Sequence, residues 1–244
     1  MENIIKQLKN YLEMLKYSGL DVIEMVPHIQ NSETVETQAG IQKEASPKEN
    51  LLSLREVVIH CTQCSELAQT RKSVVFGAGN VRAQLVFVGE APGHDEDFQG
   101  LPFVGQAGQL LTKIIESIGL TRQNVFICNV LKCRPPGNRN PLPEEIANCE
   151  PYLFKQLEII QPKIICALGT FAAQTLLKTE SSISSLRGKF HEFRGCKLIC
   201  TFHPAYLLRN PEEKRKVWED MKMIRAELSA TTKMSSPHAL IGDP

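Results

Sequence analysis

The sequence lacks any apolar run approaching the roughly 18 residues that cross a bilayer, so we expect neither a membrane span nor a membrane partner. No continuous apolar stretch follows the first residues, Met1-Glu2-Asn3, so a secretory signal is not expected either. The eight cysteines therefore indicate the reducing cytoplasm, where cysteine clusters more often hold metal than form disulfides. A net charge of +1 excludes a highly basic protein that coats nucleic acid, but not a DNA enzyme with a local basic surface.

The 244 residues have room for one large domain or two small ones, and 42% apolar with 23% charged residues is a soluble, globular composition. Apolar residues at helical spacing predict a helix over 3–18, whereas the stretch from Pro27 to Asn50 is too polar to bury a core. The first 50 residues hold 5 basic and 8 acidic side chains, so the other 194 hold 23 and 19 and carry the positive charge. We therefore predict four segments: a helical extension (1–26), a flexible linker (27–50), a folded domain (51–229) and a disordered tail (230–244).

Four short, continuously apolar runs alternate with helical patterns in the folded domain. Runs of this kind are typical of strands that are buried on both faces of a sheet. The alternation predicts an α/β fold in which helices cover both faces of a parallel sheet, and ligands bind at the carboxyl ends of such strands. The predicted strands are Leu85–Val88, Val125–Cys128, Ile164–Ala167 and Leu198–Cys200.

The segments that follow these strands contain the candidate functional residues. The first strand leads into Gly89-Glu90-Ala91-Pro92-Gly93, the second into Asn129, and the fourth into His203-Pro204. The glycine-rich turn has the spacing of neither a dinucleotide site nor a phosphate loop, and it is equally consistent with an ordinary turn between a strand and a helix. The acidic residues after it are better suited to water handling or base recognition than to phosphate binding.

Four cysteines form a candidate metal set. Two residues separate Cys61 from Cys64, and 15 separate Cys133 from Cys149. A structural zinc site usually presents two close pairs, so the single close pair favours a four-thiolate iron–sulfur cluster, with zinc as the alternative. The cysteines inside the apolar runs are typical of core residues: Cys128, Cys166 and Cys200.

Together these motifs resemble the family 4 (type 4) uracil-DNA glycosylases, the iron–sulfur type. The resemblance runs from about Leu54 to Ile224, and it implies an αβα sandwich on a four-stranded parallel sheet, with a [4Fe–4S] cluster on the four cysteines. It also implies a monomer that flips uracil out of single- or double-stranded DNA and hydrolyses its N-glycosidic bond, leaving an abasic site. The matching segments are Gly89–Gly93, Gly100–Gly105, Asn129, Lys132–Pro136, Asn138-Arg139 and His203–Leu208.

The resemblance assigns residues to the base. Phe103 would stack on uracil, and Asn129 would offer one acceptor and one donor to N3–H and O4. His203 would donate to O2 as negative charge develops on the leaving base, and its place at a helix start would lower its pKa. Gly89 and Ala91 would line the substrate turn.

Further roles follow from the same resemblance. Glu90, or a water held by Glu90 and Asn138, would be the group that handles the attacking water. Glu96 would lie near C5 of uracil, where its bulk excludes the methyl group of thymine. Leu207 would fill the gap that the flipped base leaves in the duplex. No lysine falls within the principal motifs near the expected sugar carbon, so a Schiff-base lyase step is not expected.

Two basic sets and two competing functions complete the sequence-based hypotheses. Lys132, Arg134 and Arg139 are placed to meet phosphates. A second basic set is about as consistent with a solvated face as with DNA contact: Arg187, Lys189, Arg194 and Lys197.

The alternative functions are an iron–sulfur nucleic-acid-binding module without catalysis and a nucleotide-binding redox protein. The intact base-handling residues disfavour the former, and the missing dinucleotide fingerprint disfavours the latter.

Overall fold

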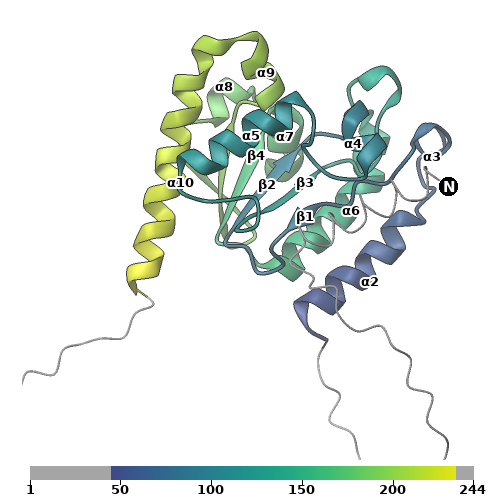
Figure 1. Ribbon diagram of the computed structural model, residues 1–244, viewed down its shortest axis with the longest axis horizontal. Helices are drawn as coiled ribbons and strands as arrows, with labels where there is room; N and C mark the ends of the chain where they lie inside the picture. Colours follow the sequence, from purple (N-terminus) through teal and green to yellow (C-terminus); the bar gives the residue numbers. More distant parts are fainter. Residues whose placement is uncertain (1–44, 235–244) are drawn as a thin grey trace, which may run out of the picture.

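The computed structural model describes residues 45–234 (Figure 1). The predicted helical extension (1–26), most of the predicted linker and the end of the predicted tail lie outside the described residues. No helix within 45–234 combines the length and apolar character that a bilayer-spanning segment requires.

The described residues form a mixed sheet of six strands in the order β1-β3-β2-β4-β6-β5. Its four central strands are parallel and are the four that the sequence predicts: β2 (Leu85–Gly89), β3 (Phe126–Asn129), β4 (Ile164–Leu168) and β6 (Cys196–Thr201). The prediction of four strands is incomplete, because the antiparallel strands β1 (Ala78–Gly79) and β5 (Phe190–Phe193) form the two edges. One has only two residues and the other is partly exposed, so neither presents a continuous apolar run.

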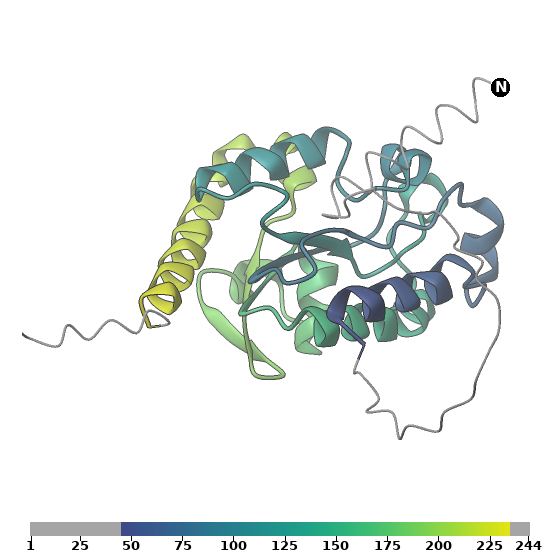
Figure 2. The ribbon, with the colours of Figure 1, turned by 60° about the horizontal axis from the view of Figure 1, so that its bottom comes forward.

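Helices cover both faces of the sheet (Figure 2). Helices α5 (Gln106–Ser117), α9 (Pro204–Arg209) and α10 (Lys214–Met234) pack on one face, and α2 (Pro47–Ile59), α6 (Pro143–Ile160) and α7 (Thr170–Leu177) pack on the other. The remaining short elements lie in the connections: α3 (Ser65–Thr70), α4 (His94–Gln99), η1 (Pro136–Asn138), α8 (Ile183–Leu186) and η2 (Pro211–Glu213).

Alternate residues of each central strand enter the two cores. In β2, Val86 and Val88 pack with α2, α6 and α7, whereas Leu85 and Phe87 pack with α5 and α10. Both faces of the strand are thus apolar, which explains its uninterrupted apolar sequence. The parallel strands end at one edge of the sheet, so the segments after β2, β3 and β6 meet there.

Two predicted segment boundaries are wrong by a few residues. Helix α2 begins at Pro47, inside the predicted linker, because Ser46 and Glu49 form a capping box in which each side chain binds the other residue's main-chain N–H. At the other end, α10 continues to Met234, past the predicted domain end at Ser229.

Candidate active site

Three predicted base-handling residues from different parts of the chain lie around Gly89, the last residue of β2. Gly89 pairs in register with Asn129, the last residue of β3. A β-carbon at Gly89 would lie 2.3 Å from Oδ1 of Asn129 and 2.6 Å from Cζ of Phe103, closer than non-bonded atoms can approach. The centroid of the Phe103 ring lies 5.6 Å from that of the His203 imidazole. The structure thus brings these four residues together at the carboxyl end of the sheet.

The main chain of Asn129 is fixed by a hydrogen bond, whereas its side-chain oxygen has no hydrogen-bond partner among the described residues. The residue is only 1% exposed, and its main-chain oxygen accepts a hydrogen bond from Nζ of Lys132 at 2.7 Å. Within residues 45–234, Oδ1 of Asn129 is buried and has no hydrogen-bond partner. Leaving a buried acceptor unpaired costs about 1–3 kcal/mol. This oxygen therefore marks a place where a donor from a ligand can bind.

The loop that carries Phe103 is fixed by Glu96 of α4. One carboxylate oxygen accepts from the main-chain N–H groups of Val104 and Gly105 at 2.9 Å and 3.0 Å, and the other accepts from that of Gly93 at 3.1 Å. These bonds join the start of α4 to the loop directly after Phe103. Glu96 thus has a structural function in this loop, and its place beside C5 of uracil stays a prediction.

His203 precedes α9, and one of its two ring nitrogens is already engaged. Nδ1 accepts a hydrogen bond from the main-chain N–H of Ala205 at 3.1 Å, so the proton of the neutral ring lies on Nε2. Burial, with a smaller contribution from the charge of Arg209, lowers the pKa of His203 to about 4. The sequence predicts a lowered pKa from the helix start, whereas burial is the larger cause. At neutral pH the ring is an uncharged donor through Nε2.

The two candidates for handling water differ in exposure. Glu90 is partly buried after β2, and burial raises the pKa of its carboxyl. Its main-chain oxygen accepts from the N–H of Leu131 at 2.9 Å, which places Glu90 beside the end of β3. Asn138 is exposed, and its Oδ1 accepts from Nε of Arg134 at 2.7 Å. Glu90 is therefore better placed to take a proton from water. Ala91 is partly buried and packs against the core.

Leu207 of α9 is completely buried. Its side chain is 0% exposed and packs in the core with Val217 and Met221 of α10, because this face of α9 turns toward the sheet. The neighbouring Tyr206 and Leu208 are 36% and 43% exposed. Leu207 is thus buried in this structure whereas Leu208 is exposed, and the filling of the gap in the duplex by Leu207 stays a prediction.

The four predicted ligand cysteines line a single pocket. Cys61 and Cys64 come from the connection between α2 and α3, Cys133 from the loop after β3, and Cys149 from α6. No three cysteine, histidine or acidic side chains of residues 45–234 converge on the position of a single ion. Four cysteines that line one pocket are the number of thiolate ligands that an iron–sulfur cluster takes.

The sulfur atoms in this pocket have N–H donors as partners. Nη1 of Arg71 donates to Sγ of Cys133 at 3.1 Å, and the main-chain N–H of Lys132 donates to Sγ of Cys149 at 3.3 Å. Hydrogen bonds of this kind surround metal-bound thiolates and tune their charge. Burial raises the pKa of the Cys149 thiol to about 12, so this sulfur is protonated at neutral pH unless a metal binds it. The donor set therefore fits an iron–sulfur cluster.

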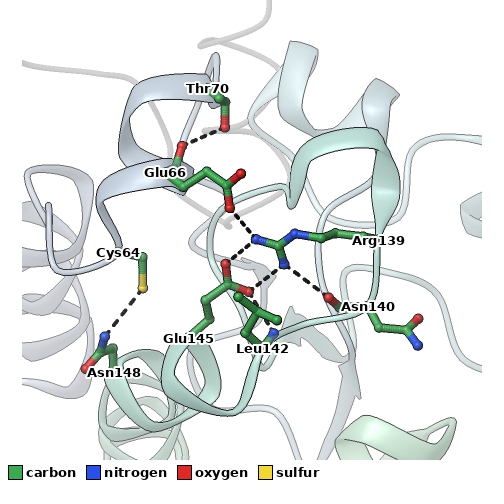
Figure 3. A network of polar contacts seen from close by, with 8 residues as sticks. All are labelled: Cys64, Glu66, Thr70, Arg139, Asn140, Leu142, Glu145 and Asn148. Atoms are coloured by element: carbon green, nitrogen blue, oxygen red, sulfur yellow. Dashed lines mark hydrogen bonds and ion pairs between the residues drawn. The ribbon is translucent and has the colours of Figure 1, made fainter.

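Arg139 is bound by two carboxylates beside this pocket (Figure 3). Its Nη2 lies 2.6 Å from an oxygen of Glu66 and 2.6 Å from one of Glu145, and its Nη1 donates to the second Glu145 oxygen at 2.9 Å. These ion pairs join α3, which begins directly after Cys64, to α6, which carries Cys149. Arg139 thus ties two cysteine-bearing segments together, and its contact with a phosphate stays a prediction.

Lys132 was also predicted as a phosphate contact, and it is buried instead. It is 1% exposed, and its Nζ donates to the main chain of Asn129 and, at 2.6 Å, to the side-chain oxygen of Gln156. The sequence does contain a signal for this pair. Gln156 falls between Leu153 and Leu157 on the apolar stripe of α6, where a polar residue requires a buried partner.

Arg187, a member of the second basic set, also has partners. Arg187 donates to both carboxylate oxygens of Asp220, at 2.8 Å and 3.2 Å, and Thr201 donates to the same carboxylate at 2.6 Å. Asp220 is completely buried on the inner face of α10. This network lies under the end of β6, two residues before His203. Arg187 therefore does not belong to a solvated face, and its contact with DNA stays a prediction.

The chain is similar in sequence to known uracil-DNA glycosylases. The sequence profile of the uracil DNA glycosylase superfamily matches residues 76–222. A type-4 uracil-DNA glycosylase of Archaeoglobus fulgidus is 46% identical over 184 residues, which is 72% of this chain and 92% of that protein. One from Thermotoga maritima is 46% identical over 184 residues, 73% of this chain and 95% of that protein. One from Saccharolobus solfataricus is 44% identical over 191 residues, 75% of this chain and 88% of that protein.

The chain belongs to the type-4 uracil-DNA glycosylase family. The matched segment contains the ends of all four parallel strands, and thus the grouping around Gly89. Cys61 and Cys64 lie before the superfamily match begins at residue 76, although Cys133 and Cys149 fall within it. The superfamily match therefore covers the base-handling end of the sheet and half of the cysteine set.

Proposed function

We propose that this chain is a monofunctional DNA-repair glycosylase that hydrolyses the N-glycosidic bond of uracil in DNA and leaves an abasic site. The observation that carries the proposal is the buried Oδ1 of Asn129, which has no partner among residues 45–234 and lies in the same group as Phe103 and His203. An acceptor beside an aromatic ring suits a flat base with an N–H donor on its edge. The type-4 relatives support the same substrate.

Asn129 selects the base in this proposal. Its Oδ1 accepts from N3–H of uracil, and its Nδ2 donates to O4. Cytosine presents an acceptor at N3 and an amino group at C4, which reverses both positions. Because the main chain of Asn129 is fixed by Lys132, the amide cannot move away from this mismatch at low cost. Phe103 stacks on the face of the base.

His203 stabilises the leaving group. Its Nε2–H donates to O2 of uracil, where negative charge develops as the glycosidic bond breaks. The Ala205 N–H fixes the ring tautomer through Nδ1, so the donor is in place before the reaction begins. Because the pKa of His203 is lowered to about 4, the ring is neutral at neutral pH and stabilises the uracil anion as a hydrogen-bond donor rather than as a cation.

Glu90 handles the attacking water. A carboxylate with a raised pKa takes a proton from water more readily than an ordinary surface carboxylate does. Asn138 assists from η1, where Arg134 holds its side-chain oxygen. Lys132, the lysine in the matching motif, does not act as an amine nucleophile, because its Nζ is buried and donates to two acceptors. We therefore propose hydrolysis without a Schiff-base step on Lys132.

The substrate is uracil-containing DNA, and the base must leave the helix to reach Asn129. Leu208 replaces Leu207 as the side chain that fills the vacated gap, because it is exposed at the same short helix. Cys61, Cys64, Cys133 and Cys149 hold a [4Fe–4S] cluster. When bound, the cluster supplies structural cross-linking of three chain segments rather than a chemical step.

The test is incubation of the purified protein with an oligonucleotide that contains one uracil, followed by alkaline cleavage at the abasic site. We expect cleavage of the uracil strand and none of a matched cytosine strand. His203→Ala should reduce the single-turnover rate by about 10²- to 10³-fold, or roughly 2.7–4 kcal/mol. Binding should weaken much less, because phosphate contacts dominate affinity.

Asn129→Asp supplies the matched test of base selection. The carboxylate replaces the amide donor with a second acceptor, so O4 of uracil would face an oxygen, whereas the cytosine amino group would gain a partner. We expect loss of uracil excision and a trace of cytosine excision. A wild-type protein that binds DNA but releases no uracil would instead identify a non-catalytic iron–sulfur module.

A further inference from the structure

Phe103 has a backbone conformation that an aromatic residue rarely adopts. Its φ is +54°, in the left-handed region that favours glycine. The side chain is only 6% exposed, and its ring contacts the space around Gly89. Because the direction of this ring depends on the unusual backbone, neighbouring groups must hold the peptide in place.

One arginine holds the two carbonyl groups at this position. Arg122 lies in the turn between α5 and β3, and its Nη2 donates to the main-chain oxygen of Pro102 at 2.7 Å. Its Nη1 donates to the main-chain oxygen of Phe103 at 3.2 Å and lies 3.4 Å from Oγ1 of Thr112. The planar guanidinium thus binds two consecutive carbonyls with separate nitrogens, a geometry that a lysine ammonium does not reproduce.

Helix α5 presses on the same peptide from another direction. A β-carbon at Gly108 would lie 1.8 Å from the main-chain oxygen of Phe103 and 2.0 Å from its carbon. Only the absence of a side chain at Gly108 permits this approach. The Phe103 carbonyl is therefore confined by the helix backbone and bound by the arginine.

We infer that Arg122 is a positioning residue for Phe103, holding its ring in the orientation that stacks on the flipped base. This inference rests on the proposed function, in which Phe103 contacts uracil. In this inference Arg122 acts through Phe103 and does not itself contact the base. It lines a cavity of about 270 Å³ whose lining includes Phe103 and Thr112 but neither Asn129 nor His203.

The cavity provides a way to separate positioning from general stability. Arg122→Ala would enlarge it, and a free guanidinium ion could then enter and bind the two carbonyls again. We expect Arg122→Ala to lower kcat/KM on a uracil oligonucleotide by about tenfold to a hundredfold. A few millimolar guanidinium chloride should restore part of this loss, whereas equal sodium chloride should not. Arg122→Lys should remain impaired, and the exposed Arg82→Ala serves as the control.

A double-mutant cycle with Phe103→Ala identifies the partner of Arg122. If the arginine acts by placing the ring, Arg122→Ala should have little further effect once the ring is absent, and guanidinium should not rescue that double variant. An equal loss in both backgrounds would overturn the inference and leave a structural role alone. Unchanged activity in Arg122→Ala would overturn it as well.

A measurement without catalysis keeps this inference separate from the proposed function. In protein labelled with ¹³C-phenylalanine, the Phe103 ring signals are assigned by their loss in Phe103→Leu. We expect Arg122→Ala to shift or broaden these signals and guanidinium to restore them. If the wild type releases no uracil, the proposed function fails, while the ring signals still decide whether Arg122 positions Phe103. Ring signals that do not respond to Arg122→Ala would overturn the inference.

Discussion

The base-handling end of the sheet and the cysteine pocket are built in opposite ways. Around Gly89 the main chain sets the geometry: two strands end in register, a glycine leaves space, and Phe103 is held in a left-handed conformation. In the pocket, side chains from three separate segments set it, with Arg139 joining α3 to α6.

The difference shows which region depends on its ligand for stability. At the strand ends one acceptor, Oδ1 of Asn129, is left unpaired among residues 45–234, so the fold bears a small cost for a preorganised site. In the pocket Cys149 is buried, and burial raises the pKa of its thiol to about 12. A cluster would use these sulfurs and cross-link the segments, so we expect the pocket to depend on its metal much more than the base site depends on uracil.

The largest effect should come from the pocket. Cys133→Ala, like Cys61→Ala, should abolish the brown iron–sulfur absorbance and most of the soluble protein, because one cluster ligand that cross-links the segments is lost. Absorbance spectra and iron analysis of the soluble fraction measure this. Cys200→Ala is the matched control, since Cys200 is a buried core thiol outside the pocket and its loss should leave the colour intact. A colourless wild type with zinc and no iron would refute the cluster.

For a physical reason, the sequence predicts which residues lie at the carboxyl ends of the strands better than it predicts the partners of the charged residues. Buried parallel strands require continuous apolar runs, and a polar residue directly after such a run, such as Asn129, must lie at the carboxyl edge. The partners of charged residues leave no comparable pattern. The phosphate contacts of Lys132 and Arg139 are predicted from their charge and their place beside the cysteine segment, and only the fold shows that each is already bonded. Strand β5 was missed because an edge strand with one exposed face carries no apolar run.

The next effect separates the two titratable groups at the strand ends. Burial raises the pKa of Glu90, so lowering the pH protonates it and should reduce kcat/KM while the pH is still above about 4, where His203 remains neutral. The acid limb of the pH profile therefore belongs to Glu90. Glu90→Gln should lose about 10²-fold or more in rate and flatten that limb. An acid limb that persists in Glu90→Gln but disappears in His203→Ala would reverse the assignment.

A smaller but cleaner perturbation is Gly89→Ala. Its β-carbon would lie 2.3 Å from Oδ1 of Asn129 and 2.6 Å from the Phe103 ring, so both base-handling groups must shift. We expect uracil excision to fall by roughly tenfold to a hundredfold, because displacements of about 1 Å at a reacting centre have effects of this size. The iron–sulfur absorbance should not change, since Gly89 lies outside the cysteine pocket. Parallel loss of colour and activity would show that the two regions are not separable.

The smallest effect on excision distinguishes two adjacent leucines. Leu208 is 43% exposed, so Leu208→Ala should leave the melting temperature unchanged and slow excision from duplex DNA by about fivefold, or about 1 kcal/mol, as a side chain that fills the vacated gap is lost. Excision from single-stranded DNA, which has no such gap, should be unaffected. Leu207→Ala should do the reverse: it removes a completely buried side chain and should lower the free energy of unfolding by about 2–5 kcal/mol, with the duplex-to-single-strand ratio preserved. If Leu207→Ala alone changes that ratio, the buried leucine must leave the core when DNA binds, and the exposed one has no role in the gap.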